Sequence, residues 1–577
     1  MKILLTTLNA KYVHTPLGIW SIYQYCRKQF PGLALSEYNI NQDLHWISGE
    51  IYLERAEVVA FSCNIWNLAQ TLSISHWLKR VAPETTIVLG GPEVWEDPVG
   101  LLREHPWIDQ IVVGEGELTF AEWLREYTSA EPRWENVLGL VYRSGPELVQ
   151  NPPRPQIADL NQLAFPYPED LAPFREKMVY YETSRGCPFH CQYCLSANEH
   201  GVRYWDVERV KSELLRFIQA GIGQIKFVDR SFNCHPERAK TLWRFLLEEG
   251  GQTNFHFEIV AELLDEESLE LLAAAPPGLF QVEAGIQSTH PATLTAIRRT
   301  MDFQKVSQNI QRLIRQSKVF VHLDLIAGLP GEDYQTFGKT VDDVLQLRPH
   351  RLQLGFLKLL HGSGIRQRAA EYGYQYTPEA PYEVLANRWI GYDELLRLKV
   401  IEDLLGRYYN SGHFQLSVEW FFQRYRSPFR FFEEFGAWWK TRGLDRVAHK
   451  SRDLYQYLLR FYETTAGATT EIRNLLKFDL LQAERMIELP EWAGPGHVDL
   501  QKLGYTFWQN EANRERYIPD WDGRSIREIQ RRVLFGQFEI DPLGAAPLTN
   551  GPPTTVCRYL FVYRGNAVAT HRLEEFG

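Results

Sequence analysis

The chain has 577 residues, and since domains average about 150 residues it should divide into roughly three or four units. Its 44% hydrophobic and 13% aromatic content excludes global disorder, and its net charge of -10 disfavours nucleic acid as a partner. No apolar run long enough to span a membrane and no signal peptide is evident, so we expect a cytoplasmic protein.

Residues 1–145 alternate short apolar runs with amphipathic stretches, which is typical of an α/β domain with a doubly wound, Rossmann-like sheet. Ligands of such sheets bind where the strands end and the turns begin. The turns here carry glycine or small polar residues, so we expect a cofactor domain. The predicted strands are Ile3–Leu5, Val58–Phe61, Ile87–Leu89 and Ile111–Val113, and the predicted helices are Gly18–Lys28, Ala69–Val81 and Leu118–Tyr127.

Residues 146–177 are rich in proline, which disfavours helices and central strands and predicts a linker. Over residues 178–362 strand and helix patterns alternate again. Six such units predict a partial (β/α)6 barrel, whose chemistry belongs at the carboxyl ends of its strands. The predicted strands are Val179–Thr183, Gln224–Val228, Phe255–Val260, Leu279–Ile286, Phe320–Ile326 and Leu352–Leu357, and the predicted helices include Val207–Ala220 and Pro236–Glu249.

Residues 363–577 form an accessory region that is predicted to be mainly helical. Long aromatic-rich helical patterns cover Pro381–Tyr409 and Val447–Thr464. Near the end of the chain, Thr555–Tyr563 and Ala567–Arg572 flank Arg564-Gly565-Asn566 in the pattern of a terminal β-hairpin. No motif in this region indicates its role.

Three of the seven cysteines, Cys187, Cys191 and Cys194, lie within eight residues and follow the first predicted barrel strand. The C-x3-C-x2-C spacing can hold three corners of a cubane iron–sulfur cluster and leave the fourth iron open for chemistry. Structural zinc, with His190 or a distant residue as fourth ligand, is the alternative, but zinc sites favour two separated pairs of ligands. We therefore expect a [4Fe–4S] cluster on these cysteines.

The segment CPFHCQYC resembles the signature of radical S-adenosylmethionine (radical SAM) enzymes, and the six-unit barrel fits their partial (β/α)6 fold. Further landmarks of that family follow at strand ends: FVDRSFN at 227–233, EAGIQS at 283–288 and DLIAGLPG at 324–331. The resemblance implies that the open iron binds SAM and that an electron cleaves SAM to a 5′-deoxyadenosyl radical. An electron donor such as flavodoxin or ferredoxin is then implied as a partner.

The resemblance also implies a SAM site, although it assigns no catalytic residue. Relatives often carry a second acid after Asp229, where this chain has Arg230, so the substrate contact at that position stays open. The implied contacts are Tyr193 beside the adenine, Asp229 near the amino group, Glu283 with Ser288 near the ribose or carboxylate, and Gln287 and Gly328 in the same strand-end segments.

The front domain resembles the cobalamin-binding domain that precedes many radical SAM barrels. The resemblance rests on FSCN at 61–64, VLGGPE at 88–93 and VGEGE at 113–117. Glycines at strand ends let the backbone approach a bulky ligand, and the small Ser62 leaves room for a nucleotide tail. The implied cobalamin-binding residues are Asn9, Ser62, Asn64, Gly90, Gly91, Pro92, Glu93, Gly114 and Gly116.

Many cobalamin domains supply a histidine to cobalt from an Asp-x-His-x-x-Gly motif, which is missing from the loop after the first strand. His14 lies in that loop, where a solvated histidine is the more common occupant. We therefore expect cobalamin to bind without a histidine ligand on cobalt. Cys234 follows the second barrel strand. It is either a buried packing residue, or it faces the active site as a hydrogen-atom donor or as a fourth ligand of the cluster.

These features favour a cobalamin-dependent radical SAM enzyme that methylates an unactivated carbon of an unknown substrate. The alternative is a radical rearrangement, oxidation or cyclisation, in which cobalamin is an electron carrier or is absent. Analysis of the product for an added methyl group would separate these two hypotheses. A cobalamin- or redox-responsive binding protein is a third hypothesis, which is disfavoured because a sensor needs no SAM pocket. Relatives that add sulfur to nucleic acids carry more cysteines in the front domain than Cys26 and Cys63, which disfavours that subclass.

Overall fold

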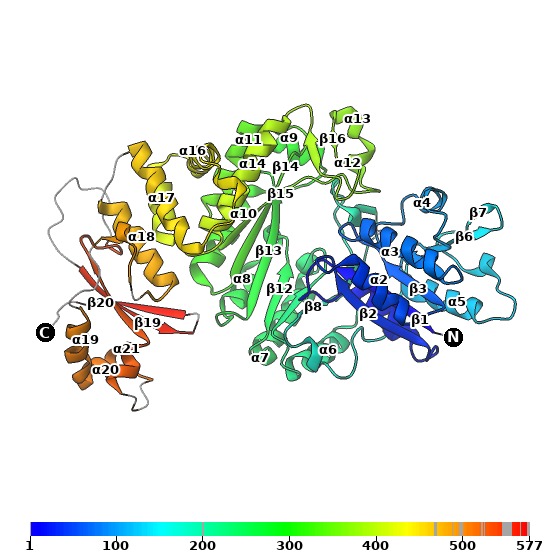
Figure 1. The fold of residues 1–577 in the computed structure, drawn as a ribbon, viewed down its shortest axis with the longest axis horizontal. Coiled ribbons are helices and arrows are strands. Elements are labelled where there is room, and N and C mark those ends of the chain that lie inside the picture. The colour runs from blue at the N-terminus through cyan, green and yellow to red at the C-terminus, as the bar shows by residue number, and fades with distance from the viewer. Residues whose placement is uncertain are drawn as a thin grey trace. The chain divides into compact units, whose positions relative to one another are not determined.

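The computed structural model describes residues 2–198, 201–466, 470–486, 488–494, 500–520, 523, 525–544, 557–565 and 567–573. The chain divides into two compact units, Met1–Leu395 and Leu396–Gly577. The first unit holds a sheet domain, drawn in blue and cyan, and a barrel-like domain, drawn in green (Figure 1). Within the described residues, no helix is both long enough and apolar enough to cross a membrane.

The N-terminal domain consists of strands β1 (Ile3–Asn9), β2 (Leu33–Asn39), β3 (Val58–Ser62), β4 (Thr86–Gly90), β5 (Gln110–Val112), β6 (Leu140–Ser144) and β7 (Glu147–Gln150) and helices α1 (Leu17–Cys26), α2 (Leu44–Leu53), α3 (Leu68–Val81), α4 (Pro98–Glu104) and α5 (Gly116–Tyr127). The sheet order is β2-β1-β3-β4-β5-β6-β7. The first five strands are parallel, and β6 and β7 add an antiparallel hairpin beside β5. Helices α1 and α5 pack on one face and α2, α3 and α4 on the other, which confirms the doubly wound fold.

The predicted linker at 146–177 includes β7 of the N-terminal sheet, and its remaining residues 151–177 contain no strand and two short 3-10 turns, Leu160–Gln162 and Ala172–Phe174. Tyr167 in this segment is buried. Its hydroxyl lies 2.9 Å from the Thr15 hydroxyl of the N-terminal domain and donates to the carbonyl of Tyr180 over 2.5 Å. The segment therefore packs between the two domains that it connects.

The barrel-like domain is a six-stranded sheet in the order β15-β14-β13-β12-β11-β8. Its strands are β8 (Met178–Tyr181), β11 (Gln224–Phe227), β12 (Asn254–Glu258), β13 (Phe280–Gln287), β14 (Phe320–Ala327) and β15 (Arg351–Phe356). All neighbours are parallel, and β8 and β15 are the two edges, so the barrel is partial as predicted. The connecting helices are α6 (Val207–Gln219), α7 (Pro236–Glu249), α8 (Glu266–Ala273), α9 (Pro291–Ala296), α10 (Phe303–Gln316) and α11 (Tyr334–Leu345).

Smaller elements complete the first unit. A hairpin of β9 (Ser184–Gly186) and β10 (Val202–Tyr204) lies between β8 and α6. After β15 the chain forms α12 (Gly364–Gln367), α13 (Ala369–Tyr372), β16 (Gln375–Tyr376) and β17 (Val384–Ala386). The residues of β13 alternate between buried and half-buried, so successive side chains face the helices and the barrel interior in turn. Polar side chains thereby line the inner face.

The free edge of β8 is covered by the loop that follows β1. His14 forms a parallel bridge with Met178. The Met178 amide donates to the Val13 carbonyl over 2.8 Å, and the Tyr180 amide donates to the Thr15 hydroxyl over 3.0 Å. The N-terminal domain therefore supplies hydrogen-bond partners that an edge strand would otherwise lack.

A buried ion-pair network also joins the two domains. Arg185 on β9 lies 2.6 Å from Glu117, 3.0 Å from Glu115 and 2.7 Å from Glu182. Arg203 on β10 lies 3.0 Å from Glu115. We call these five residues the junction network. It ties the turn after β5 to the strand that leads into the clustered cysteines.

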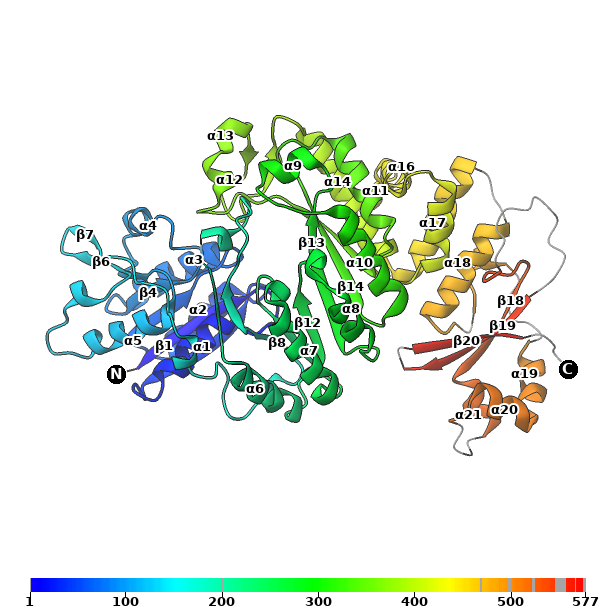
Figure 2. The same ribbon diagram turned by 180° about the vertical axis from the view of Figure 1, so that it is seen from behind.

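The second unit is mainly helical and ends in an antiparallel sheet of β18 (Val533–Phe538), β19 (Cys557–Arg564) and β20 (Ala567–Leu573), drawn in red (Figure 2). Strands β19 and β20 form the predicted hairpin, although Asn566 of its turn lies outside the described residues. Strand β18 was not predicted. The helices are α14 (Tyr392–Leu404), which begins in the first unit, α15 (Gln415–Arg424), α16 (Pro428–Thr441), α17 (Ser451–Ala466), α18 (Thr470–Ala483), α19 (Leu500–Gln509), α20 (Glu511–Tyr517) and α21 (Ile526–Gln530).

One helix prediction is wrong over part of its length. The predicted helical pattern Pro381–Tyr409 is helical only from Tyr392, and it ends in a π-helical turn over Leu405–Tyr409. The preceding residues contain β17. Pro381 and Gly391 disfavour a helix in that stretch, and the apolar residues there match either kind of element.

Candidate active site at the carboxyl ends of the barrel strands

The three clustered cysteines lie on one loop directly after β9. Cys187 and Cys191 are buried, Cys194 is half-buried, and all three are free thiols. Burial raises the pKa of the Cys187 thiol, and the neighbouring Cys194 and Cys191 raise it further. Thiolates are the protein ligands of iron–sulfur clusters, so this set of donors fits such a cluster.

The backbone fixes this loop on both sides. Gly186 has a φ of +99°, and a Cβ atom there would lie 2.2 Å from the carbonyl oxygen of Gly201. Within the loop, the Gln192 amide donates to the Ile297 carbonyl over 2.9 Å, and the Gln192 carbonyl accepts from the Ile365 amide over 2.9 Å. The positions of the cysteines are therefore set by contacts within the chain.

Arg299 lies beside the cysteine loop, a placement that the sequence did not reveal. Its Nη1 lies 3.8 Å from Cys191 Sγ, and its Nη2 donates to the Gly285 carbonyl. The buried Nε has no hydrogen-bond partner among the described residues. Burial raises the pKa of the nearby Tyr193 hydroxyl, which interacts with both Arg299 and Cys191. The Arg299 guanidinium, whose Nε–H has no acceptor among the described residues, therefore lies beside a predicted cluster ligand, Cys191, and the predicted adenine contact, Tyr193.

Asp229 follows β11 and is fully buried, but the chain itself uses its carboxylate. Oδ2 accepts from the Thr183 amide over 2.8 Å, and Oδ1 accepts from the hydroxyls of Thr183 over 2.7 Å and Ser184 over 2.6 Å. Burial raises the pKa of Asp229, although these donors oppose the shift. Asp229 therefore anchors the start of β9, and its contact with SAM stays a prediction.

Gln287 and Ser288 follow one another at the end of β13. Gln287 has a φ of +70°, a conformation that costs a non-glycine residue about 1–3 kcal/mol. The pairing of β13 with β14 shifts register between Gly285 and Gln287. The buried Oε1 of Gln287 has no hydrogen-bond partner in the described part of the chain. A strained side chain with an unmet acceptor suits a ligand contact better than a packing role.

Glu332 is a second site residue that the sequence analysis missed. Its buried carboxylate accepts from the hydroxyls of Ser288 over 2.8 Å and Thr340 over 2.7 Å. Burial raises the pKa of Glu332 to about 7. Gly328, at the end of β14, has a φ of +89°, and its carbonyl accepts from the Tyr374 hydroxyl over 3.0 Å. The ends of β13 and β14 are therefore held by hydrogen bonds with Glu332 and Tyr374, respectively, each of which lies far from its partner in the sequence.

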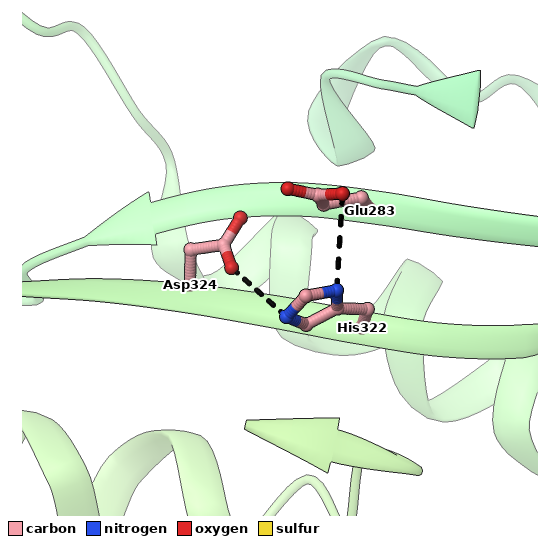
Figure 3. Close-up of side chains that lie close together, drawn as sticks. All are labelled: Glu283, His322 and Asp324. Atoms are coloured by element: carbon pink, nitrogen blue, oxygen red, sulfur yellow. Dashed lines mark ion pairs between the residues drawn. The ribbon is translucent and has the colours of Figure 1, made fainter. Parts of the chain in front are cut away.

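Glu283 lies further back on β13, facing the barrel interior. Its Oε2 is 2.9 Å from Lys226 Nζ and 2.9 Å from His256 Nε2. Burial alone would raise the pKa of Glu283, but His256 and Lys226 hold it below its usual range. His322 and Asp324 extend from the neighbouring strand β14 toward Glu283 (Figure 3). We call these five residues the inner-face cluster.

The predicted cobalamin residues gather at one edge of the N-terminal sheet. Parallel strands β1, β3 and β4 end at Asn9, Ser62 and Gly90, so the turns that follow them lie at the same edge. That edge carries all of Asn9, Ser62, Asn64, Gly90, Gly91, Pro92, Glu93, Gly114 and Gly116.

The glycines at this edge serve different purposes. A Cβ atom on Gly91, whose φ is +106°, would lie 2.4 Å from the Cys63 carbonyl oxygen, so local packing requires glycine. A Cβ atom on Gly116 would lie 2.6 Å from Ile22 Cδ1. Gly114 has a φ of +85°, and a Cβ atom there would meet nothing within 4 Å. The turn after β5 therefore presents open backbone to a ligand.

Other predicted contacts at this edge have partners within the chain. The Asn9 amide group donates to Glu37 over 3.0 Å, and the Asn64 backbone amide donates to Asn67 Oδ1 over 2.7 Å. Glu93 accepts from the Tyr382 hydroxyl over 2.6 Å. Burial raises the pKa of Glu93.

Two residues that the sequence left open lie at the domain contacts and near the barrel mouth. His14 is half-buried in the loop after β1, where its ring packs edge-on against Tyr180 with centroids 5.6 Å apart and its backbone pairs with β8. Cys234 Sγ lies 3.4 Å from the Tyr204 hydroxyl. Burial raises the pKa of the Cys234 thiol.

Three protein-family models match successive parts of the chain. The B12 binding domain matches residues 3–124, and the radical SAM superfamily matches residues 181–344. A family described as a protein of unknown function (DUF4080) matches residues 370–550. The chain therefore carries a B12-binding domain, a radical SAM domain and a DUF4080 region, which confirms the resemblance inferred from the sequence.

Curated relatives match about half of the chain. The cobalamin-dependent radical SAM methyltransferase TokK of Streptomyces tokunonensis is 25% identical over 345 residues, or 56% of this chain and 50% of that protein. The uncharacterized methyltransferase PH0819 of Pyrococcus horikoshii is 29% identical over 299 residues, or 49% of this chain and 63% of that protein. The matches thus span about half to two thirds of these relatives.

Solved structures agree with the fold. OxsB with aqua-cobalamin and S-adenosylmethionine bound has a TM-score of 0.58 at 14% identity, covering 83% of this chain and 79% of that one. TsrM from Kitasatospora setae with cobalamin and a [4Fe-4S] cluster bound has a TM-score of 0.52 at 17% identity, covering 66% and 81%. These likenesses confirm the predicted fold class.

Proposed function

We propose that this protein is a cobalamin-dependent radical SAM methyltransferase that acts on an unactivated carbon of a small molecule. The observation that carries the proposal is the loop of three free thiols at the barrel mouth, in the same structural unit as the glycine-lined edge of the B12-binding domain. The names of the relatives support a methyl transfer.

The cysteines Cys187, Cys191 and Cys194 are the residues that would hold the cluster. When bound, the cluster and SAM supply a 5′-deoxyadenosyl radical, and cobalamin carries the methyl group. Arg299 places a positive charge beside these thiolates, and Asp229 holds the strand that enters their loop. Gln287, Ser288 and Gly328, with Tyr193, would contact SAM at the mouth of the barrel.

Cobalamin would lie against the carboxyl edge of the N-terminal sheet, nearest to the open backbone at Gly114. We propose that no histidine binds the cobalt, because His14 is held against β8 and Tyr180. The domains are proposed to span residues 1–145, 178–362 and 363–577, with a linker at 146–177 of which residues 147–150 form β7 of the N-terminal sheet. A flavodoxin or ferredoxin would deliver electrons, and the free cysteines suit a reducing, cytoplasmic compartment.

The test is anaerobic reconstitution with iron, sulfide, cobalamin and methyl-labelled SAM, followed by metabolite comparison of a deletion strain and its parent. The expected product carries the label, and 5′-deoxyadenosine is released only with a reductant present. Release of 5′-deoxyadenosine without any labelled product would support radical chemistry but contradict methyl transfer.

A ring-forming cyclisation is the second candidate, because three relatives have a cyclase activity in their names. An anaerobic magnesium-protoporphyrin IX monomethyl ester cyclase of Cereibacter sphaeroides is 24% identical over 328 residues, or 53% of this chain. The same assay separates the two candidates, since a cyclisation changes the product mass without adding the label.

A further inference from the structure

The inner-face cluster contains side chains that the proposed chemistry does not use. Glu283 on β13 and His322 and Asp324 on β14 project from adjacent strands into the barrel interior (Figure 3). The His322 ring lies between the two carboxylates, with Nδ1 3.8 Å from Glu283 Oε2 and Nε2 3.1 Å from Asp324 Oδ1. One atom from each of the three residues lies within 4.8 Å of the others.

Several polar atoms of this cluster are buried without an aligned partner. His322 Nε2, Asp324 Oδ1 and His256 Nε2 make no hydrogen bond with correct geometry to any described residue, despite their short distances to charged neighbours. Both imidazoles are 5% exposed. Such atoms are rare in folded proteins, since each costs about 1–3 kcal/mol when left unmet. Together they point to a ligand within the cluster.

The charges indicate that the ligand is a cation. Lys226 lies 2.9 Å from Glu283 and 3.5 Å from Glu258, so it is shared by two carboxylates. Asp324 contacts His322 and interacts with the Glu283 carboxyl. Neither His322 nor Glu283 carries a fixed positive charge that would balance the Asp324 carboxylate. Two carboxylates this close are stabilised by a proton or a metal ion between them.

We propose that Glu283, His322 and Asp324 bind a divalent transition-metal ion in the barrel interior. The His322 Nε2 to Asp324 Oδ1 distance of 3.1 Å is that of neighbouring ligands which each lie about 2.1 Å from one ion. Imidazole and carboxylate ligands suit zinc, manganese and iron(II). Lys226 and His256 both approach Oε2 of Glu283, so Oε1 would be the oxygen that binds the ion. This proposal gives Glu283 a role other than the SAM contact implied by the resemblance, and it does not depend on the proposed function, whose SAM contacts are other residues.

The experiment uses the full-length chain with Cys187, Cys191 and Cys194 all replaced by alanine, so that thiolates cannot compete for metal. Cobalt(II) is titrated into this protein anaerobically and followed by visible absorption. The expected result is about one equivalent of bound cobalt with ligand-field bands and no sulfur charge-transfer band. Absence of bound cobalt would overturn the proposal.

Substitutions in the same background locate the ion. His322→Ala and the near-isosteric Asp324→Asn should each weaken cobalt binding by about tenfold or more. His76→Ala, an exposed histidine of the N-terminal domain, is the matched control and should leave binding unchanged. Circular dichroism shows whether each variant is folded. Folded His322→Ala and Asp324→Asn variants that bind cobalt as tightly as the control would place the ion elsewhere and overturn the assignment.

Discussion

Gly91 and Gln287 both have left-handed backbone conformations, but for different physical reasons. At Gly91 a Cβ atom would collide with the Cys63 carbonyl, so the packing of the turn itself excludes any side chain. At Gln287 a side chain is present despite the strain, and its buried oxygen has no partner among the described residues. Strain at a polar residue with an unmet acceptor is a sign of function, whereas a glycine at such a position is not.

The contrast between Gln287 and Asp229 yields a first prediction. Gln287→Ala should weaken SAM binding by roughly tenfold, the effect of about one hydrogen bond, and leave the iron content unchanged. Asp229→Ala should lower both, because it leaves the Thr183 amide and two hydroxyls without their acceptor near the cysteine loop. SAM titration and iron analysis of both reconstituted variants make the comparison. Normal iron in Asp229→Ala would show that its contacts do not position the loop.

The cysteine loop gives a second prediction. Anaerobically reconstituted protein should contain about four irons, and the variant with Cys187, Cys191 and Cys194 replaced by alanine should contain almost none. Cys234→Ala serves as the matched control, because its thiol interacts with Tyr204 and lies outside the loop. Full iron in the triple variant would show that other ligands hold the cluster.

The sequence predicts some site residues and not others because of the range of their contacts. The three cysteines are predicted ligands of one iron–sulfur cluster and lie within one loop, so their spacing in the sequence is enough to predict them. Arg299 and Glu332 acquire their roles from contacts with Cys191 and Ser288 that span 108 and 44 residues. Glu332 follows a glycine turn and Arg299 follows a short helix, and neither pattern differs from that of an ordinary surface charge.

Among the elements, helix α15 depends on a cap from another helix. No side chain of its own caps its first turn. Asp479 on α18 instead accepts from the Leu416 amide over 3.1 Å and from the Ser417 amide over 2.9 Å and hydroxyl over 2.6 Å. Such a contact stabilises the helix start and fixes α15 against α18.

This cap predicts a pH dependence of stability. Burial raises the pKa of Asp479 from 3.8 to about 7, so the folded state holds this proton more tightly than the unfolded state does. The contribution of the protonated Asp479 to the free energy of unfolding is therefore complete below about pH 4. It is lost as the pH rises through about 7, which lowers the free energy of unfolding by up to about 4 kcal/mol. In urea unfolding of the full chain, Asp479→Asn should remove this dependence of the free energy of unfolding on pH between about 4 and 7. Asp445→Asn, an exposed acid of the same unit, should not.

Strands that are continuous buried apolar runs were predicted more accurately than half-buried strands such as β2, which was missed. The six barrel strands lie within a few residues of their predicted ranges because each is a buried apolar run between helices of clear periodicity. Strand β18 was missed because the partner of Phe538 is Cys557, 19 residues further on, which is too far for the short turn that marks a hairpin. The strand β17 was missed because three residues carry too little pattern.

At the scale of the whole chain, the junction network connects the two domains that are proposed to hold the cofactors. Arg185 interacts with three carboxylates, and its side chain is 14% exposed. Removal of one partner from a buried ion pair costs about 3–5 kcal/mol because the remaining charges are not compensated. The network also joins Glu115, next to the open turn at Gly114, to Arg185, two residues before Cys187, so it links the two proposed cofactor sites.

Arg185→Met should therefore loosen the domain contact. The expected results are faster proteolysis within residues 151–177 and weaker retention of cobalamin, with the fold of each domain preserved. Lys2→Met removes an exposed pair with Glu54 at the far end of β1 and should change neither, since exposed pairs contribute about 0–1 kcal/mol. Equal proteolysis rates for the two variants would contradict a role for Arg185 in holding the domains together.

The contact of the β1 loop with β8 determines how the protein can be dissected. Residues 13–15 satisfy the free backbone groups of β8, so a fragment that begins at Met178 would expose that row to solvent. Exposed edge strands template pairing with other chains. The radical SAM domain expressed without its neighbour should thus self-associate, as light scattering of matched fragments with and without residues 1–177 would reveal. Solubility of the barrel is in this sense a property supplied by the preceding domain.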